Sequence, residues 1–183
     1  MVRLIPGPLT CFARQYAYHV LDPCISGWLN AKPKLNRRCR RPGLRSLDLH
    51  GNKLTRVDGL QTLHSLRELI LDHNILKYLD AGCFASVPRL RRLHLGHNGL
   101  RSLAHLSNLT RLQFLHIGSN RITEITELDR LTNLVSLTEV WLVDNLVAKK
   151  QWYRALLLSK CRQLKVSSVQ MVTHFTITGT HLL

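Results

Sequence analysis

The feature that most constrains this fold is a phrase of eleven residues that recurs five times between Leu44 and Val147. Each copy has the form L-x-x-L-x-L-x-x-N-x-L, with Ile or Val replacing Leu at a few positions. The copies begin at Leu44, Leu66, Leu90, Leu112 and Leu137, so the repeat lengths are 22, 24, 22 and 25 residues. Repeats of this period are typical of stacked architectures, in which each unit buries its apolar face only against its neighbours. Five copies in phase therefore predict a solenoid.

The spacing of the apolar residues predicts the local structure of each coil. The central L-x-L alternation indicates a short strand with one face in the core, and stacked copies place such strands side by side in a parallel sheet. After the asparagine, apolar residues recur every third position, as at Leu54, Val57, Leu60 and Leu63. That spacing suits 3₁₀ turns, which have about three residues per turn. We expect an α/β solenoid with parallel strands on the concave face and short helical or 3₁₀ turns on the convex face.

The asparagine of each copy is expected to have a structural role. It stands where the backbone must bend inside the core, and a short amide side chain can pair backbone groups that would otherwise lose hydrogen bonds. The predicted asparagine ladder comprises Asn52, Asn74, Asn98, Asn120 and Asn145.

These phased copies resemble the leucine-rich repeat superfamily, and their period-three spacing is similar to its SDS22-like class. The segment KKQWYRALLLSKCRQLKV, residues 149–166, resembles the C-terminal cap helix of that class, although Ser167 and Ser168 stand where such caps tend to carry an aspartate. The resemblance implies a cytoplasmic, non-catalytic protein-binding module, including the kind found in cilia.

We divide the chain into four parts. Residues 1–43 form a basic, poorly ordered segment in which prolines and glycines interrupt any long element, although Phe12 to Val20 could form a short helix or strand. Residues 44–147 are the five repeats and 167–183 a β-prone tail. Residues 148–166 are the cap helix, because their apolar residues have amphipathic spacing: Trp152, Tyr153, Leu156, Leu157 and Leu164.

No convincing amphipathic helix precedes Leu44, although the end of a solenoid exposes core leucines that need a cap. We therefore expect the chain to be a truncated or alternatively started version of a longer repeat array, and residues 44–166 alone to be poorly soluble.

Positive charge is concentrated near the N-terminus. The net charge is +15, and residues 1–43 contain eight Lys or Arg but only one acidic residue. The cluster comprises Lys32, Lys34, Arg37, Arg38, Arg40 and Arg41. It fits either a localisation or nucleic-acid patch or a solvated linker, and we favour the linker because no aromatic residue inside it could stack on bases.

The cysteines indicate a reducing compartment. Five are scattered without a C-x-x-C pair, which argues against a disulfide framework and a zinc site. The apolar run at the N-terminus is broken by Pro6, Gly7 and Pro8, which makes it a poor signal peptide. We expect a cytoplasmic protein, with the nucleus as the alternative.

The residues between the buried strand positions should form columns on the concave face. Aromatic and aliphatic side chains there, flanked by charges, are typical of protein-binding surfaces; the alternative is that they pack on one another or on the tails of the chain. The candidate partner-binding residues are Glu68, Ile70, Asp72, Arg92, His94, Phe114, His116, Glu139 and Trp141.

No metal site, cofactor or catalytic group is predicted. His94 and His116 should be neighbours, but no third ligand stands at an evident spacing, although Asp72 or Glu139 can be considered. The ten histidines otherwise look dispersed, and no nucleophile, phosphate-binding loop or carboxylate pair is apparent. We expect a non-catalytic scaffold that binds another protein on the concave face. The alternatives are a ribonucleoprotein-associated protein and, by resemblance only, a phosphatase-regulatory one; the sequence leaves the oligomeric state open.

Overall fold

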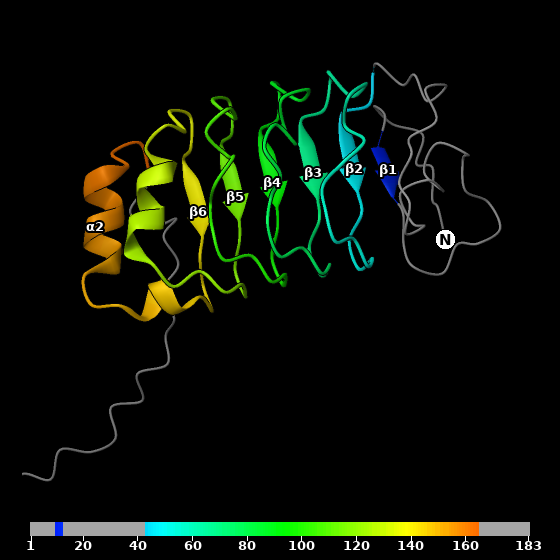
Figure 1. Ribbon diagram of the computed structural model, residues 1–183. Helices are drawn as coiled ribbons and strands as arrows, with labels where there is room; N and C mark the ends of the chain where they lie inside the picture. Colours follow the sequence, from blue (N-terminus) through cyan, green and yellow to red (C-terminus); the bar gives the residue numbers. More distant parts are fainter. Residues whose placement is uncertain (1–9, 13–42, 165–183) are drawn as a thin grey trace, which may run out of the picture.

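The computed structural model describes residues 10–12 and 43–164. In this part the chain winds into stacked coils that each contribute one short strand, and the strands lie side by side along the stack (Figure 1). The strands are β1 (Thr10–Phe12), β2 (Ser46–Asp48), β3 (Glu68–Ile70), β4 (Arg92–His94), β5 (Phe114–His116) and β6 (Glu139–Trp141).

All six strands belong to one parallel sheet, in sequence order. The middle residues of β2 to β6 are aligned with one another and point into the core, where none is more than 3 % exposed. Their neighbours on either side point outward, because successive side chains of a strand alternate between its two faces. The predicted parallel-strand solenoid is confirmed.

The return path of each coil is built from tight turns whose leucines complete the core. Leu63 N donates to Leu60 O at 3.0 Å and Leu66 N to Leu63 O at 3.0 Å, which is the i→i+3 bonding expected from period-three spacing. Regular 3₁₀ helices form at η1 (Ile125–Leu131) and η2 (Leu146–Lys149). The helix η1 takes up the extra residues of the fourth repeat.

The asparagine side chains join each coil to the one before it. Asn120 Nδ2 donates to Leu95 O at 2.9 Å and to Ile117 O at 3.1 Å, and its Oδ1 accepts from Leu100 N at 3.0 Å. Asn74, Asn98 and Asn145 bond in the same way. The residue before each asparagine has a positive φ, which turns the backbone at this point: Gly51 (67°), His73 (55°), His97 (51°), Ser119 (52°) and Asp144 (58°).

The C-terminal end of the stack is covered by α2 (Tyr153–Lys160), which lies beyond β6 and contacts η1 and η2 (Figure 1). Tyr153, Leu157 and Cys161 are buried against the core. Within the segment 148–166 that we predicted as the cap, the α-helix itself covers Tyr153–Lys160. Trp152, which we placed on its apolar face, is 73 % exposed because it precedes the helix with a left-handed backbone, φ 64°.

We did not predict β1 from the sequence, because Thr10–Phe12 lies outside the repeated phrase. It pairs with β2 and so extends the sheet into the segment that we considered separate from the solenoid. An edge strand presents unpaired N–H and C=O groups, which a further strand can satisfy. The basic cluster from Lys32 to Arg41 and the tail 167–183 lie outside the described residues.

Candidate functional site

The outward residues of the strands form two aligned rows on what we call the sheet face. Ser46, Glu68, Arg92, Phe114 and Glu139 are in register in the first row. The second row is Asp48, Ile70, His94, His116 and Trp141. The backbone ladder continues past the strands, with Gly51 N donating to Asp72 O and His73 N to Gly96 O, each at 3.0 Å. A third row follows: His50, Asp72, Gly96, Gly118 and Val143.

Aromatic rings link the two rows over β4, β5 and β6. The centroid of the Phe114 ring lies 4.9 Å from that of His94 and 5.9 Å from that of Trp141, and the His116 and Trp141 rings meet edge to face at 5.7 Å. Trp141 Nε1 donates to Glu139 Oε1 at 2.7 Å, which fixes the indole. We call His94, Phe114, His116 and Trp141, with the neighbouring Ile70, the aromatic cluster. Its side chains pack on one another and also stay partly exposed.

Charged side chains border the aromatic cluster. Glu68 accepts a hydrogen bond from Ser46 Oγ at 3.0 Å, and its other oxygen lies 3.7 Å from Arg92 Nη1. The Arg92 side chain is 64 % exposed, so its charge is available to a ligand. The cluster therefore has an apolar centre and a polar border.

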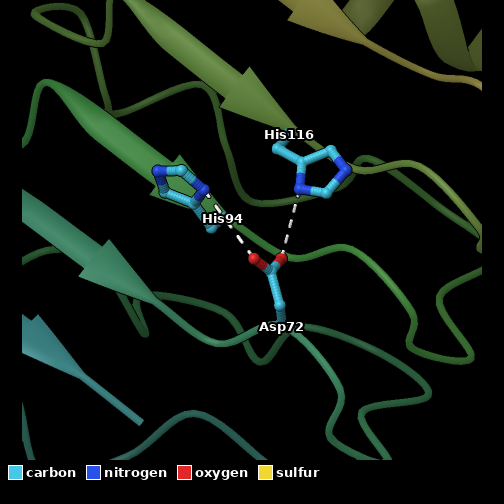
Figure 2. A group of neighbouring side chains, drawn as sticks. All are labelled: Asp72, His94 and His116. Atoms are coloured by element: carbon cyan, nitrogen blue, oxygen red, sulfur yellow. Dashed lines mark ion pairs between the residues drawn. The ribbon is translucent and has the colours of Figure 1, made fainter. Parts of the chain in front are cut away.

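Asp72 points toward the two histidines of the second row, although it comes from the third row (Figure 2). Its Oδ1 lies 3.3 Å from His116 Nδ1, and its Oδ2 lies 3.7 Å from His94 Nδ1. One ligand atom from each residue can be chosen so that all three lie within 4.8 Å of one another. We expected no metal site, because Asp72 has no regular spacing from the histidines; the fold nevertheless brings the three together.

Two glycines make room for this arrangement. A Cβ at Gly96 would lie 2.4 Å from His116 Cε1 and 3.0 Å from Asp72 Oδ1, and one at Gly118 would lie 3.2 Å from His116 Nε2. Because Gly96 separates Asp72 from His116 in the sheet, only a residue without a side chain allows them to meet.

The surroundings shift the protonation of two of these groups. Burial opposes ionisation of Asp72, but the hydrogen bonds from His116 and the Gly96 N–H, together with the positive charge that His116 can carry, lower the Asp72 pKa. Desolvation lowers the pKa of His94, and this outweighs the attraction of Asp72 and Glu68 for a proton on that ring. Asp72 is therefore ionised and His94 neutral near pH 7.

A second group of histidines lies in the turns that follow the strands. The rings of His73 and His97 stack at 4.0 Å, and His50 tilts against His73 at 4.8 Å. Desolvation and the neighbouring histidines lower the pKa of His73. The sequence alone suggests that the remaining histidines are dispersed, whereas the structure places these three side by side. The repeat period could have predicted this stacking, because His73 and His97 occupy the same position of their repeats, directly before the ladder asparagine.

A shallow pocket on the turn side contains no activated nucleophile. It is lined by residues that include Arg56, Asp80 and Cys83. Burial raises the pKa of Cys83 to about 12, so its thiol stays protonated. Among residues 10–12 and 43–164, no helix is long and apolar enough to cross a bilayer.

Three family models match the chain, and all three describe leucine-rich repeats. "Leucine rich repeat" matches residues 64–122, "Leucine-rich repeat" matches 107–176 and "Leucine Rich repeats (2 copies)" matches 42–81. Together they span the repeats, the cap and part of the tail.

Known proteins and structures are similar over parts of their length. Podocan-like protein 1 of Mus musculus is 49 % identical over 70 residues, which are 38 % of this chain and 12 % of that protein. U2 small nuclear ribonucleoprotein A' of Homo sapiens is 30 % identical over 127 residues, which are 69 % of this chain and 41 % of that protein. An internalin of Listeria monocytogenes shares the fold, with a TM-score of 0.55 and 22 % identity over 68 % of this chain and 34 % of its own. The chain thus spans less than half of these proteins.

The phased repeats, the parallel sheet and these matches agree. The chain is a leucine-rich repeat protein.

Proposed function

We propose that this chain is a non-catalytic, intracellular scaffold that binds another protein on its sheet face. Leucine-rich repeat proteins generally mediate protein–protein interaction, and their fold is typical of non-catalytic modules. The aromatic cluster is the observation that carries the proposal, because partly exposed rings with a polar border are what binding hot spots contain.

The geometry of the cluster favours binding over simple surface packing. Trp141 is held by Glu139 and by the rings of Phe114 and His116, so little side-chain freedom would be lost on contact with a partner. The rings span three adjacent strands, about 10 Å across at the usual strand spacing. A partner helix or loop can cover that width.

The test is affinity capture with the full chain, followed by affinity measurements with the purified partner. Phe114→Ala and Trp141→Ala should each weaken binding by about 2 kcal/mol or more, roughly 30-fold in Kd, while the melting curve changes little. The matched control is Tyr78→Ala with Val135→Ala, two exposed side chains (61 % and 68 %) outside the strands. Capture unaffected by loss of Phe114 and Trp141 would refute the proposal.

A second candidate function is association with a ribonucleoprotein. It is favoured by the similarity to U2 small nuclear ribonucleoprotein A' and by the basic cluster Lys32–Arg41, which lies outside the described residues. If this cluster contacts RNA, affinity should fall steeply with salt, and deletion of the cluster should abolish binding. RNA binding that survives the deletion would exclude this role for the cluster.

We also propose that the repeats belong to the SDS22-like class, on the basis of their period-three turns and terminal helix. Segments 69–74, 84–98, 125–140 and 149–166 resemble part of leucine-rich repeat-containing protein 9.

A further inference from the structure

The His94 ring lies between two carboxylates without a hydrogen bond to either. Its Nδ1 is 3.7 Å from Asp72 Oδ2, and its Nε2 is 3.9 Å from Glu68 Oε1. Nε2 is buried, and it is the one such side-chain atom among the described residues that has no hydrogen-bond partner. A neutral imidazole has one N–H and one lone pair. One of the two carboxylates therefore faces the lone pair of the neutral ring, an unfavourable arrangement that a cation bound between them would relieve.

We propose that Asp72, His94 and His116 bind a Zn²⁺ ion on the sheet face. Zn²⁺ takes imidazole nitrogen and carboxylate oxygen at about 2.0–2.2 Å in a tetrahedral arrangement, which sets adjacent ligand atoms about 3.3–3.5 Å apart. His116 Nδ1 lies 3.3 Å from Asp72 Oδ1 and His94 Nδ1 lies 3.7 Å from Asp72 Oδ2, and one ligand atom from each residue lies within 4.8 Å of the other two. Binding would require the ligand atoms to move closer together, from separations of up to 4.8 Å, around one carboxylate oxygen.

The chemistry of the three groups suits this ion. Two imidazoles and one carboxylate form a ligand set of intermediate softness that Zn²⁺ favours over Mg²⁺ or Ca²⁺. Metal binding requires neutral histidine and ionised aspartate. Three protein ligands leave the fourth position open to water or to a side chain of another molecule.

The groups behind the ligands are arranged as in metal sites. Asp72 Oδ1 accepts the Gly96 N–H at 2.5 Å, which orients the carboxylate. If His94 Nδ1 binds the ion, its Nε2–H faces Glu68, a carboxylate held in turn by Ser46. A metal-bound histidine usually donates its other N–H to such a group.

The metal site shares His94 and His116 with the aromatic cluster, but the two proposals can be tested separately. Phe114 supplies no ligand, so Phe114→Ala should reduce protein capture and keep metal binding. Failure of metal binding would in turn leave partner capture by the aromatic cluster untouched.

The experiment is titration of the EDTA-treated full chain with Zn²⁺ by calorimetry, with metal content measured after dialysis. Wild type should bind one Zn²⁺ per chain. Asp72→Asn, His94→Gln and His116→Gln should each weaken binding at least about 100-fold, and Glu68→Gln about 10-fold. The matched control is His105→Gln, which removes an exposed histidine outside the cluster and should leave the affinity unchanged.

Co²⁺ separates this site from the cysteines of the chain. Co²⁺ bound to nitrogen and oxygen in a tetrahedral site absorbs in the visible without a thiolate charge-transfer band, and that spectrum should disappear in His94→Gln. Gly96→Ala supplies a further test, because it displaces His116 and Asp72 and removes no ligand. Gly96→Ala should therefore weaken Zn²⁺ binding. If this variant does not fold, the three ligand variants alone test whether the site binds the ion. Equal Zn²⁺ affinity in wild type, Asp72→Asn and His94→Gln would overturn the proposal, as would the absence of binding by wild type.

Discussion

Removal of one asparagine side chain from the ladder should lower the free energy of unfolding more at the C-terminal end of the ladder than in its interior. The comparison is Asn145→Ala with Asn120→Ala, two buried side chains that make equivalent hydrogen bonds. The truncation removes the same atoms at both sites. The difference therefore comes from which backbone groups are left without a partner.

Removal of the Asn120 side chain leaves one group unpaired. Leu95 O keeps the Asn98 amide, Ile117 O keeps the Asn145 amide, and Gly118 O keeps the His97 N–H. Among the described residues, only Leu100 N–H loses its acceptor. One buried unpaired group costs about 1–3 kcal/mol.

Removal of the Asn145 side chain leaves two groups unpaired. Ile122 N–H loses its acceptor, and Leu142 O loses its donor because no later coil in the described part of the chain supplies a second amide. The expected cost is about 2–6 kcal/mol, so Asn145→Ala should be less stable than Asn120→Ala by about 1–3 kcal/mol.

The assay is urea unfolding followed by far-UV circular dichroism, with hydrogen exchange of the Leu100 and Ile122 amides as a local measurement. Asn133→Ala, at an exposed asparagine outside the ladder, is the control and should change stability by less than about 0.5 kcal/mol. If Asn120→Ala lowers the free energy of unfolding as much as Asn145→Ala or more, at unchanged m-values, then a second amide donor on the shared carbonyl groups does not explain the stability of the ladder.

Three further predictions concern other parts of the fold. Burial opposes ionisation of Glu127, but hydrogen bonds from Ser102 and Leu103 and the charge of Arg130 lower its pKa below the ordinary 4.5. The unfolded chain thus takes up this proton at higher pH, and the stabilisation present at neutral pH is lost as pH falls through the lowered pKa. In acid titrations of stability, Glu127→Gln should lack this loss, whereas Glu124→Gln, at a 68 % exposed side chain, should keep it. Ser119 has φ 52°, a left-handed conformation that a β-branched residue adopts only with strain. Ser119→Val should therefore lower the free energy of unfolding by about 1–2 kcal/mol, whereas Ser119→Asn should be nearly neutral. Equal melting temperatures of the two variants would contradict this. The raised pKa of Cys83 leaves roughly a thousandfold less thiolate than an ordinary cysteine, so alkylation at pH 8, followed by mass spectrometry, should be slow in the native protein and fast in urea; equal rates would show that Cys83 is not shielded.

The repeated phrase was sufficient to predict the strands, their parallel order and the rows on the sheet face. Strand position follows from period-two leucines, and one register applies to every coil because all copies share one phase. Strand β1 could not be predicted in this way, because Thr10–Phe12 contains no copy of the repeated phrase. Its only strand partner is β2, which belongs to the first repeat.

The strand register alone does not predict that Asp72 lies close to both His94 and His116. The rows place His94 beside His116, but Asp72 reaches them diagonally, across a position where Gly96 has no side chain. The usable signal was two glycines, Gly96 and Gly118, beside two histidines on consecutive coils. Exposure of Trp152 was also unpredictable, because it follows from one left-handed backbone residue.

The repeat lengths differ, yet the strands stay in register from β2 to β6. Every additional residue is accommodated on the turn side, as η1 shows. Evolution or an engineer can therefore lengthen a loop near Val135 without moving any side chain that a ligand would touch. The two sides of this molecule can change independently of each other.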